Sequence, residues 1–242
     1  MRVRKSAVHR PVELGDGSAG EPPVLPGGDG RPALWLVRTD RFRAVAARAA
    51  ATVLDAEERR RAAAFRRAED RETYVAGHVG LRTLLGAYLE LPPGDVPLER
   101  RPCSFCGQPH GRPVVRGNPV HFSLSHTAGL CLLAFATAPV GVDIEGVPAL
   151  AVAAEAGTAL HPREIAELDR CDAVERPAAF ARVWARKEAY LKGLGTGLGR
   201  APSLDYLGTA PDAATAPPGW TVDDVTVDQG YTAAVAVATA GG

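Results

Sequence analysis

The sequence has few cysteines, few lysines and no long apolar run, and each scarcity excludes a class of protein. No run of about eighteen apolar residues is present to cross a bilayer. Four cysteines in 242 residues do not make a disulfide framework. With 28 basic and 28 acidic residues the net charge is zero, so no overall field attracts nucleic acid or an anionic membrane. The basic segment Met1–Arg10 is not followed by an apolar signal segment, so we expect a cytoplasmic protein with reduced thiols.

The composition that is present supports a folded protein after a flexible start. A hydrophobic content of 46% in this length can bury a substantial core, in one large domain or two small ones. From about Val12 to Arg31 the chain is rich in Gly, Pro and Asp without periodicity. We therefore predict a flexible leader over residues 1–31 and a fold that begins near Ala33.

The pattern of the remaining residues predicts a mixture of helices and strands. Expected strands cover residues 33–37, 120–122, 130–136, 140–144 and 231–238. Expected helices cover residues 42–51, a segment that starts at 55–58 and breaks near 68–70, and then 71–89, 162–168 and 177–194. Each half of the chain alternates strands and helices, but the sequence shows no internal repeat.

Three short runs carry the residues with chemical potential: Phe122–His126 (FSLSH), Gly141–Glu145 (GVDIE) and Trp184–Lys192 (WARKEAYLK). Asp143 and Glu145 lie two apart in an expected strand, so both leave the same face. Glu188 and Lys192 lie four apart in an expected helix and share one side. If the runs converge, three acids, a histidine and a lysine could hold a metal ion on a phosphate, since Mg²⁺ prefers oxygen ligands.

Each run also has a plainer interpretation. The two acids of the strand could be solvated on an exposed face, and the Glu188–Lys192 pair could belong to an ordinary surface helix. His126 could be a structural histidine. Ser125 and His126 could suggest a hydrolase pair, but adjacent residues rarely face each other and no G-x-S-x-G elbow surrounds Ser125.

In their order and spacing, the three runs and the tail Gly193–Leu198 (GLGTGL) resemble the Sfp-type 4'-phosphopantetheinyl transferases, which load carrier proteins from coenzyme A. The resemblance implies an α+β fold of two similar lobes related by a pseudo-twofold axis. The lobes would span residues 32–138 and 139–242, with the active site in the cleft between them.

The resemblance also implies the reaction and its residues. A serine of an apo acyl or peptidyl carrier protein attacks the β-phosphorus of coenzyme A, and adenosine 3',5'-bisphosphate leaves. Asp143, Glu145 and Glu188 would hold Mg²⁺, Glu188 would be the general base, and Lys192 would stabilise phosphoryl charge. His126 would donate a hydrogen bond to a phosphate. The residues expected to bind coenzyme A are Arg61, Arg71, Arg112, Ser125, His126, Lys187 and Lys192.

Some features remain open at this stage. Thr73 stands where the family often has arginine, so Arg71 could supply the missing contact with the 3'-phosphate. Cys103, Cys106 and His110 have zinc-ligand spacing, with His121 or Cys131 as a distant fourth ligand, although a loop with incidental cysteines explains them better. A zinc-stabilised interaction module and a non-catalytic coenzyme A- or carrier-binding protein are the competing functions. The resemblance, together with a length that fits two lobes, implies a monomer with a transient carrier partner of polyketide, nonribosomal-peptide or fatty-acid type.

Overall fold

The computed structural model describes residues 9–15, 31–102, 107–108, 111–211 and 215–239. Its helices are α1 (Thr39–Val53), α2 (Ala56–Ala63), α3 (Ala68–Leu89), α4 (Leu150–Gly157), α5 (Pro162–Asp169) and α6 (Arg176–Leu194). Its strands are β1 (Val12–Glu13), β2 (Ala33–Arg38), β3 (Leu98–Arg100), β4 (Pro113–Val115), β5 (His121–Thr127), β6 (Leu130–Ala136), β7 (Val140–Gly146), β8 (Trp220–Val225) and β9 (Tyr231–Ala238). Short 3₁₀ turns cover Pro93–Asp95, Gly197–Gly199 and Pro202–Leu204.

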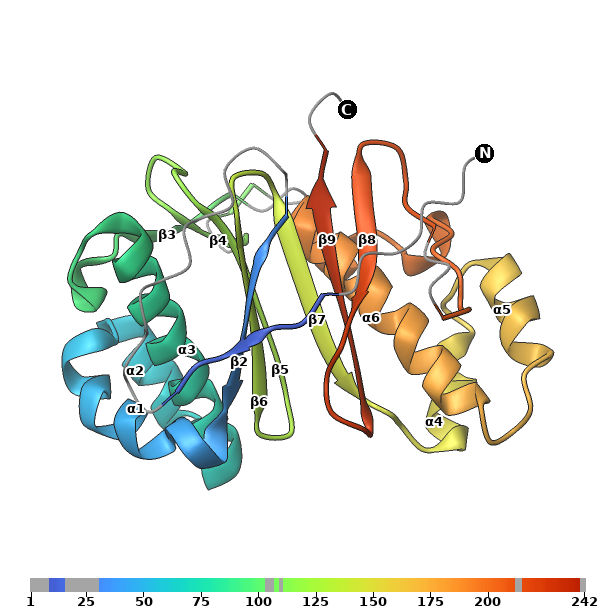
Figure 1. Ribbon diagram of the computed structural model, residues 1–242, viewed down its shortest axis with the longest axis horizontal. Coiled ribbons are helices and arrows are strands. Elements are labelled where there is room, and N and C mark those ends of the chain that lie inside the picture. Colours follow the sequence, from blue (N-terminus) through green and yellow to red (C-terminus); the bar gives the residue numbers. More distant parts are fainter. Residues whose placement is uncertain (1–8, 16–30, 103–106, 109–110, 212–214, 240–242) are drawn as a thin grey trace.

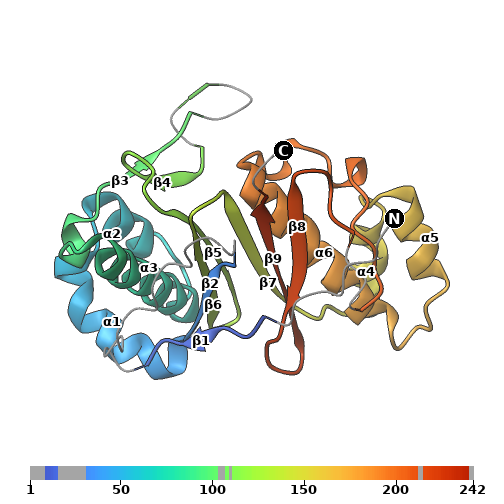
Figure 2. The same cartoon turned by 45° about the horizontal axis from the view of Figure 1, so that its top comes forward.

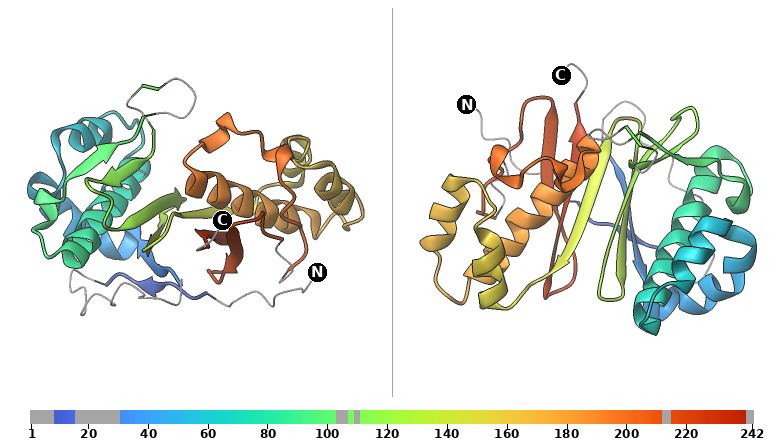
Figure 3. Two further views of the ribbon diagram at one scale, coloured as in Figure 1. Left: turned by 90° about the horizontal axis from the view of Figure 1, so that it is seen from above. Right: turned by 180° about the vertical axis from the view of Figure 1, so that it is seen from behind.

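The elements form four layers, with two sheets in the middle and helices on both outer sides (Figure 1). One sheet has the order β1-β2-β6-β5 and is covered by α1 and α3, with α2 packed on α3, whereas the other has the order β7-β9-β8 and is covered by α6, with α4 and α5 packed on the outer side of α6. The view from above separates the same two groups of helices (Figure 3). The pair β3–β4 lies outside both sheets, beyond α3 (Figure 2). The expected mixed α+β architecture is confirmed.

The two halves of the chain use the same strand order. In the first half, β2 pairs with one edge of β6 and β5 pairs with the other edge. In the second half, β7 pairs with one edge of β9 and β8 pairs with the other edge. All four pairings are antiparallel. In each half, three helices follow the first strand (β2 or β7) and precede the final hairpin (β5–β6 or β8–β9). The chain thus places β5 and β7, which carry the polar motifs, at the facing edges of the two sheets, where the two strands are in contact.

The side chains of β6 explain why this strand is apolar along its whole length. Leu130, Leu132, Ala134 and Ala136 pack into a core between the two sheets, and the alternating Cys131, Leu133 and Phe135 pack into a core beneath α1 and α3. A strand buried on both faces needs apolar residues at every position. On α3, Gly77 and Gly80 let the helix approach Cys131 and Val37 closely, since a Cβ atom would lie 2.9 Å from Cys131 Sγ at the first position and 3.1 Å from Val37 Cγ2 at the second.

Local signals fix the helix ends as the sequence predicts. Asp55 and Glu58 form a reciprocal capping box at the start of α2, with both hydrogen bonds at 2.9 Å. Pro177 lies in the first turn of α6, and Gly195 ends that helix with φ 77°, a left-handed conformation in which glycine meets no Cβ strain. The helix that presents Glu188 and Lys192 is therefore bounded on both sides by its sequence.

The structure extends or adds several elements beyond the expected ones. The strand expected to end at Phe122 continues as β5 through Ser125 and His126 to Thr127, because it pairs with β6 along its length. Helix α4 and strands β1, β3, β4 and β8 were not expected. The pattern of β8 is obscured by Asp223 and Asp224, of which Asp224 is held in an ion pair with the buried Arg186. No described helix has both the length and the apolar character needed to cross a membrane.

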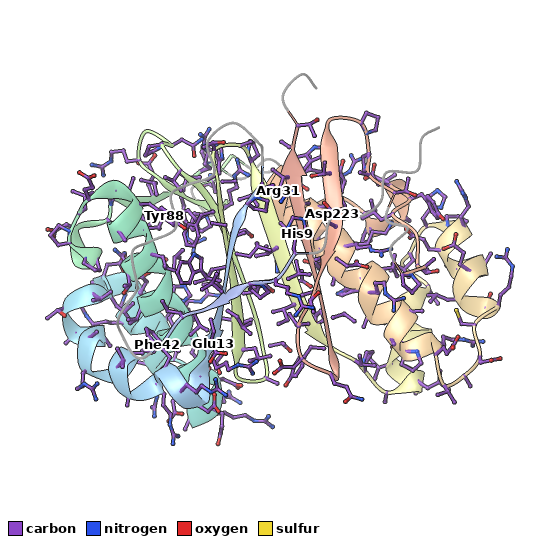
Figure 4. All side chains as sticks on the ribbon, in the orientation of Figure 1. His9, Glu13, Arg31, Phe42, Tyr88 and Asp223 are labelled. Atoms are coloured by element: carbon purple, nitrogen blue, oxygen red, sulfur yellow. The ribbon has the colours of Figure 1, made fainter. Side chains whose placement is uncertain are left out.

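Residues 9–15, the described part of the expected leader, lie across both halves. Strand β1 pairs in parallel with β2, and His9 bridges to Val225 of β8. His9 Nε2 lies 3.4 Å from Asp223, a contact that can be followed in Figure 4. This segment and the buried core between the sheets hold the two halves together.

Candidate functional site

The three polar motifs of the sequence meet where β5, β7 and α6 come together. Strand β5 lies along β7, and the backbone N–H of Val142 donates to Ser123 Oγ at 3.1 Å. Helix α6 runs so close to β7 that a Cβ on Gly141 would overlap the carbonyl oxygen of Ala189. The alternation of β7 turns Val142 and Ile144 into the core between the sheets, which leaves Asp143 and Glu145 on the side of α6.

A three-residue hydrogen-bond group forms the centre of the site. Lys192 Nζ lies 2.6 Å from Asp143 Oδ1 and donates to Ser125 Oγ at 2.9 Å. Ser125 in turn donates to the same Asp143 oxygen at 2.7 Å. The Asp143 side chain is only 2% exposed and that of Lys192 31% exposed. The buried carboxylate of Asp143 thus connects β7 to both α6 and β5, and the Lys192 side chain remains partly exposed to solvent.

The carboxylates beside this group perturb one another. The pKa of Glu145 is raised to about 7, mainly by burial and also by the charges of Asp143 and Glu188, against the opposing effect of Lys192. Burial also raises the pKa of Glu188, which Lys192 lowers and Asp143 raises. These mutual effects place three acids and one ammonium in the same electrostatic neighbourhood, as the spacing of the motifs predicts.

His126 follows Ser125 on β5 and lies close enough to two cations, Lys192 and Arg61, for their charges to affect its pKa. Partial burial lowers the pKa of its imidazole, and the positive charges of Lys192 and Arg61 lower it further. The negative charges of Asp70 and Asp143 act in the opposite direction. The ring is therefore neutral at physiological pH and carries one N–H donor beside two positive charges. This arrangement suits contact with an anionic ligand.

The expected arginines lie in two different settings. Arg61 and Arg71 are exposed on α2 and α3, and within the described part of the chain neither guanidinium forms an ion pair. Arg112 is half-buried and donates from Nη1 to the Gly193 carbonyl oxygen at 2.8 Å, at the end of the helix that carries Lys192. Burial and the nearby Arg101 lower the pKa of Arg112. Arg61 and Arg112 are thus brought near the central group, on the sides of α2 and of the α6 C-terminus.

Lys187 is separated from this group although it adjoins Glu188 in sequence. Its side chain is 2% exposed, and its ammonium lies 2.8 Å from Oε2 of the fully buried Glu164 of α5. It also donates to the carbonyl oxygen of Asp205. Glu164 accepts further bonds from the backbone N–H groups of Leu207 and Gly208 at 2.7 and 3.2 Å. Lys187 therefore ties α6 to α5 and to the chain near residue 205, on the side of the helix away from Asp143.

The donor set of the site fits an oxygen-preferring cation. Asp143 Oδ2 is buried and has no hydrogen-bond partner among the described residues. It lies in a neighbourhood with two further carboxylates whose pKa values are raised by burial and, to a smaller extent, by the negative charge of Asp143. In their present positions, no three described His, Cys, Asp or Glu side chains form a group that could hold a metal ion. A divalent cation would satisfy the orphaned oxygen and offset the repulsion, once the side chains turn toward it.

The possible zinc ligands Cys103, Cys106 and His110 lie outside the described residues. The two distant candidates for a fourth ligand are both engaged elsewhere. Cys131 is fully buried in β6 and its thiol donates to the Thr73 carbonyl oxygen. His121 Nε2 lies 3.1 Å from the side-chain nitrogen of Asn118. Cys131 is therefore a core residue, because its side chain packs against α3.

Sequence reasoning did not identify three residues that build the site. Ser123 joins β5 to β7, Gly141 admits α6, and Glu164 anchors Lys187. Thr73, noted as a departure from the family pattern, is buried between α1 and α3, where its hydroxyl donates to Glu69 and accepts from Thr39. Ser123 and Gly141 lie within the first and second motifs, which could have signalled their roles, whereas the contact of Glu164 depends on how distant elements pack.

Comparisons with known proteins agree with the site. A family model of the 4'-phosphopantetheinyl transferase superfamily matches residues 139–227, which include β7 and α6. The 4'-phosphopantetheinyl transferase HetI of Nostoc sp. is 31% identical over 213 residues, which cover 85% of this chain and 86% of that protein. Sfp of Bacillus subtilis is 27% identical over 59% of this chain and 60% of its own length, and psf-1 of Bacillus pumilus is 32% identical over 59% and 58%. The chain therefore belongs to the 4'-phosphopantetheinyl transferase superfamily.

Proposed function

We propose that this protein transfers 4'-phosphopantetheine from coenzyme A to a serine of an apo acyl or peptidyl carrier protein, in a Mg²⁺-dependent reaction. The observation that carries the proposal is the hydrogen-bonded group of Lys192, Ser125 and Asp143, with Glu145 and Glu188 beside it. The names of the relatives, all phosphopantetheinyl transferases, support the same reaction. Ammonium, hydroxyl and imidazole donors next to a set of carboxylates are what the transfer of a phosphoryl group requires.

Asp143, Glu145 and Glu188 would hold the Mg²⁺ ion. When bound, the ion supplies positive charge that offsets the charge of the pyrophosphate and keeps it in place. The orphaned Asp143 Oδ2 and the raised pKa of Glu145 support this assignment. Because Asp143 Oδ1 is already held by Lys192 and Ser125, only its second oxygen is free for another partner.

Glu188 and Lys192 account for proton transfer and for charge stabilisation in the reaction. The carrier serine oxygen forms a bond to the β-phosphorus, and the bond from that phosphorus to the bridging oxygen breaks. Glu188 accepts the serine proton, since its raised pKa makes its carboxylate a better base. Lys192 stabilises the negative charge that grows on the phosphates and protonates the leaving adenosine 3',5'-bisphosphate. No covalent enzyme intermediate is needed.

Coenzyme A would lie between the two halves, with its phosphates against Ser125, His126 and Lys192. Arg61, Arg71 and Arg112 are the cations we assign to the nucleotide end, because guanidinium pairs well with phosphate. Lys187 is left out of this set, since its ammonium is buried in the pair with Glu164. We propose two lobes, residues 32–138 and 139–242, related by a pseudo-twofold axis and preceded by residues 1–31; the shared strand order of the halves supports this division. The enzyme would act as a monomer on a transiently bound carrier.

The test is intact-mass spectrometry of apo carrier proteins incubated with the protein, coenzyme A and Mg²⁺. The expected result is a gain of one phosphopantetheine group that is lost when EDTA is added. Glu188→Gln should abolish the gain, whereas Glu155→Gln, a matched change at an exposed glutamate of α4, should leave it intact. If a folded sample binds coenzyme A but modifies no carrier, the protein is instead a non-catalytic coenzyme A- or carrier-binding member of the superfamily.

A further inference from the structure

Thr232 of β9 has a buried hydroxyl that no described residue satisfies. A buried hydroxyl without a hydrogen bond costs about 1–3 kcal/mol, so such a group calls for an explanation. Thr232 is not part of any of the three motifs. Its position in the sheet, however, places it next to the carboxylates of the site.

The register of the sheet pairs Thr232 directly with Glu145, and Ala234 directly with Asp143. Side chains of opposed residues in an antiparallel pair leave the same face, with Cβ atoms about 4.5–5.5 Å apart. Ala234 packs against Ala185 and Ala189 of α6, so this is the face that α6 covers. Thr232 therefore shares that face with Asp143 and Glu145.

The two acids of β7 differ in the hydrogen bonds that they receive. Asp143 accepts from the hydroxyl of Ser125 at 2.7 Å, across the gap between β7 and β5. Glu145 accepts no hydrogen bond from any group in the described part of the chain. A carboxylate only accepts, and a threonine hydroxyl can donate. The unsatisfied donor and the unsupported acceptor are thus cross-strand neighbours.

We propose that Thr232 is a positioning residue for Glu145: its hydroxyl donates to the Glu145 carboxylate and orients it toward Asp143 and Glu188. In this role Thr232 does for Glu145 what Ser125 does for Asp143, from the opposite edge of β7. The proposal rests on the proposed function, since it assigns Glu145 to the group that holds Mg²⁺. Partners of this kind typically change metal affinity about 10–100-fold when they are removed.

The experiment compares Thr232→Val, which keeps the shape and removes the hydroxyl, with Thr232→Ser, which keeps a hydroxyl. Thr221→Val on β8 is the matched control, because its hydroxyl bonds to the Val237 carbonyl oxygen and not to the site. The readout is Mg²⁺ binding to the whole protein by titration calorimetry, which does not depend on transfer activity. The melting temperature of each variant without Mg²⁺ shows that it is folded, and Thr232→Ala is a second hydroxyl-free variant.

We expect Thr232→Val and Thr232→Ala to weaken Mg²⁺ binding by about tenfold, and Thr232→Ser and Thr221→Val to bind as the wild type does. The Mg²⁺ concentration that gives half the maximal transfer rate should rise by the same factor. Wild-type Mg²⁺ affinity in Thr232→Val, or weakened Mg²⁺ binding in Thr232→Ser, would overturn the proposal. If the wild-type protein transfers phosphopantetheine in that case, the proposed function still stands. A wild-type protein that binds no Mg²⁺ and transfers nothing would overturn both.

Discussion

Lys192 Nζ lies 2.6 Å from Asp143 Oδ1 and thereby joins the last turn of α6 to the middle of β7. The carboxylate is buried and its ammonium partner is partly exposed, so the pair is held by the protein on one side and open to a ligand on the other. Asp143 also shares its surroundings with Glu145 and Glu188. Lys192 therefore offsets part of the negative charge of these three acids.

The stability of the protein should depend on Lys192 through Asp143. In Mg²⁺-free buffer, Lys192→Met should lower the free energy of unfolding by about 2 kcal/mol, less than the ~3–5 kcal/mol of a fully buried pair, because Lys192 is partly exposed. In an Asp143→Asn background the same change should cost below about 1 kcal/mol, since no buried charge is left unpaired. Urea denaturation of the four proteins measures this cycle. Equal costs of Lys192→Met in both backgrounds would contradict the coupling.

The two lysines of α6 should have different roles, with Lys187 important for stability and Lys192 for the substrate. Lys187→Met leaves the fully buried Glu164 without its cation, so we expect a loss of about 3 kcal/mol in unfolding free energy. The KM for coenzyme A should stay within about twofold of the wild type, because the ammonium does not face the site. Glu164→Gln combined with Lys187→Met should recover part of the stability. A large rise in the KM for coenzyme A with unchanged stability would instead show that Lys187 contacts coenzyme A.

Gly141 should be essential for the contact between β7 and α6. A Cβ at this position would overlap the Ala189 carbonyl oxygen and lie 3.0 Å from Gly193 Cα, so Gly141→Ala must push away the helix that carries Glu188 and Lys192. We expect a loss of about 3 kcal/mol or more from such overpacking, and little remaining transfer. Gly146→Ala on the same strand is the control, because its Cβ meets nothing within 4 Å. Thermal unfolding of the two variants decides the matter, and similar melting temperatures would refute the close approach.

His78 should make the protein less stable in mild acid. Burial lowers the pKa of this histidine to about 4 from an ordinary value of 6.5, and its ring stacks on Tyr74. Between pH 6.5 and pH 4, His78 therefore binds a proton in the unfolded chain but not in the folded protein. The free energy of unfolding consequently falls as the pH falls from 6.5 toward 4. The slope contributed by one such group is at most about 1.4 kcal/mol per pH unit.

Measurement of unfolding free energies from pH 7.5 down to 4.5 tests this assignment of His78. His78→Gln cannot titrate and can still donate to the Tyr74 carbonyl oxygen, which lies 3.0 Å from the histidine ring nitrogen. The variant should lose stability less steeply than the wild type over this range. Parallel curves for the two proteins would show that another group is responsible.

The sequence by itself determined the local structure and the identity of the reactive groups. Asp55, Pro177 and Gly195 fix helix ends through hydrogen bonds and backbone angles that involve only near neighbours. The two-residue spacing of Asp143 and Glu145 and the four-residue spacing of Glu188 and Lys192 fixed which side chains share a face. These features were predictable because they depend on the period of a single strand or helix.

Only the tertiary structure decided which groups meet. Lys187 and Lys192 both lie in the same motif, yet one is buried against Glu164 and the other reaches Asp143, because α6 packs against α5 on one side and β7 on the other. The pairing of Glu145 with Thr232 depends on the register of two strands that are 85 or more residues apart. Contacts of this kind arise from burial and close packing between distant segments, and no local period of the sequence encodes them.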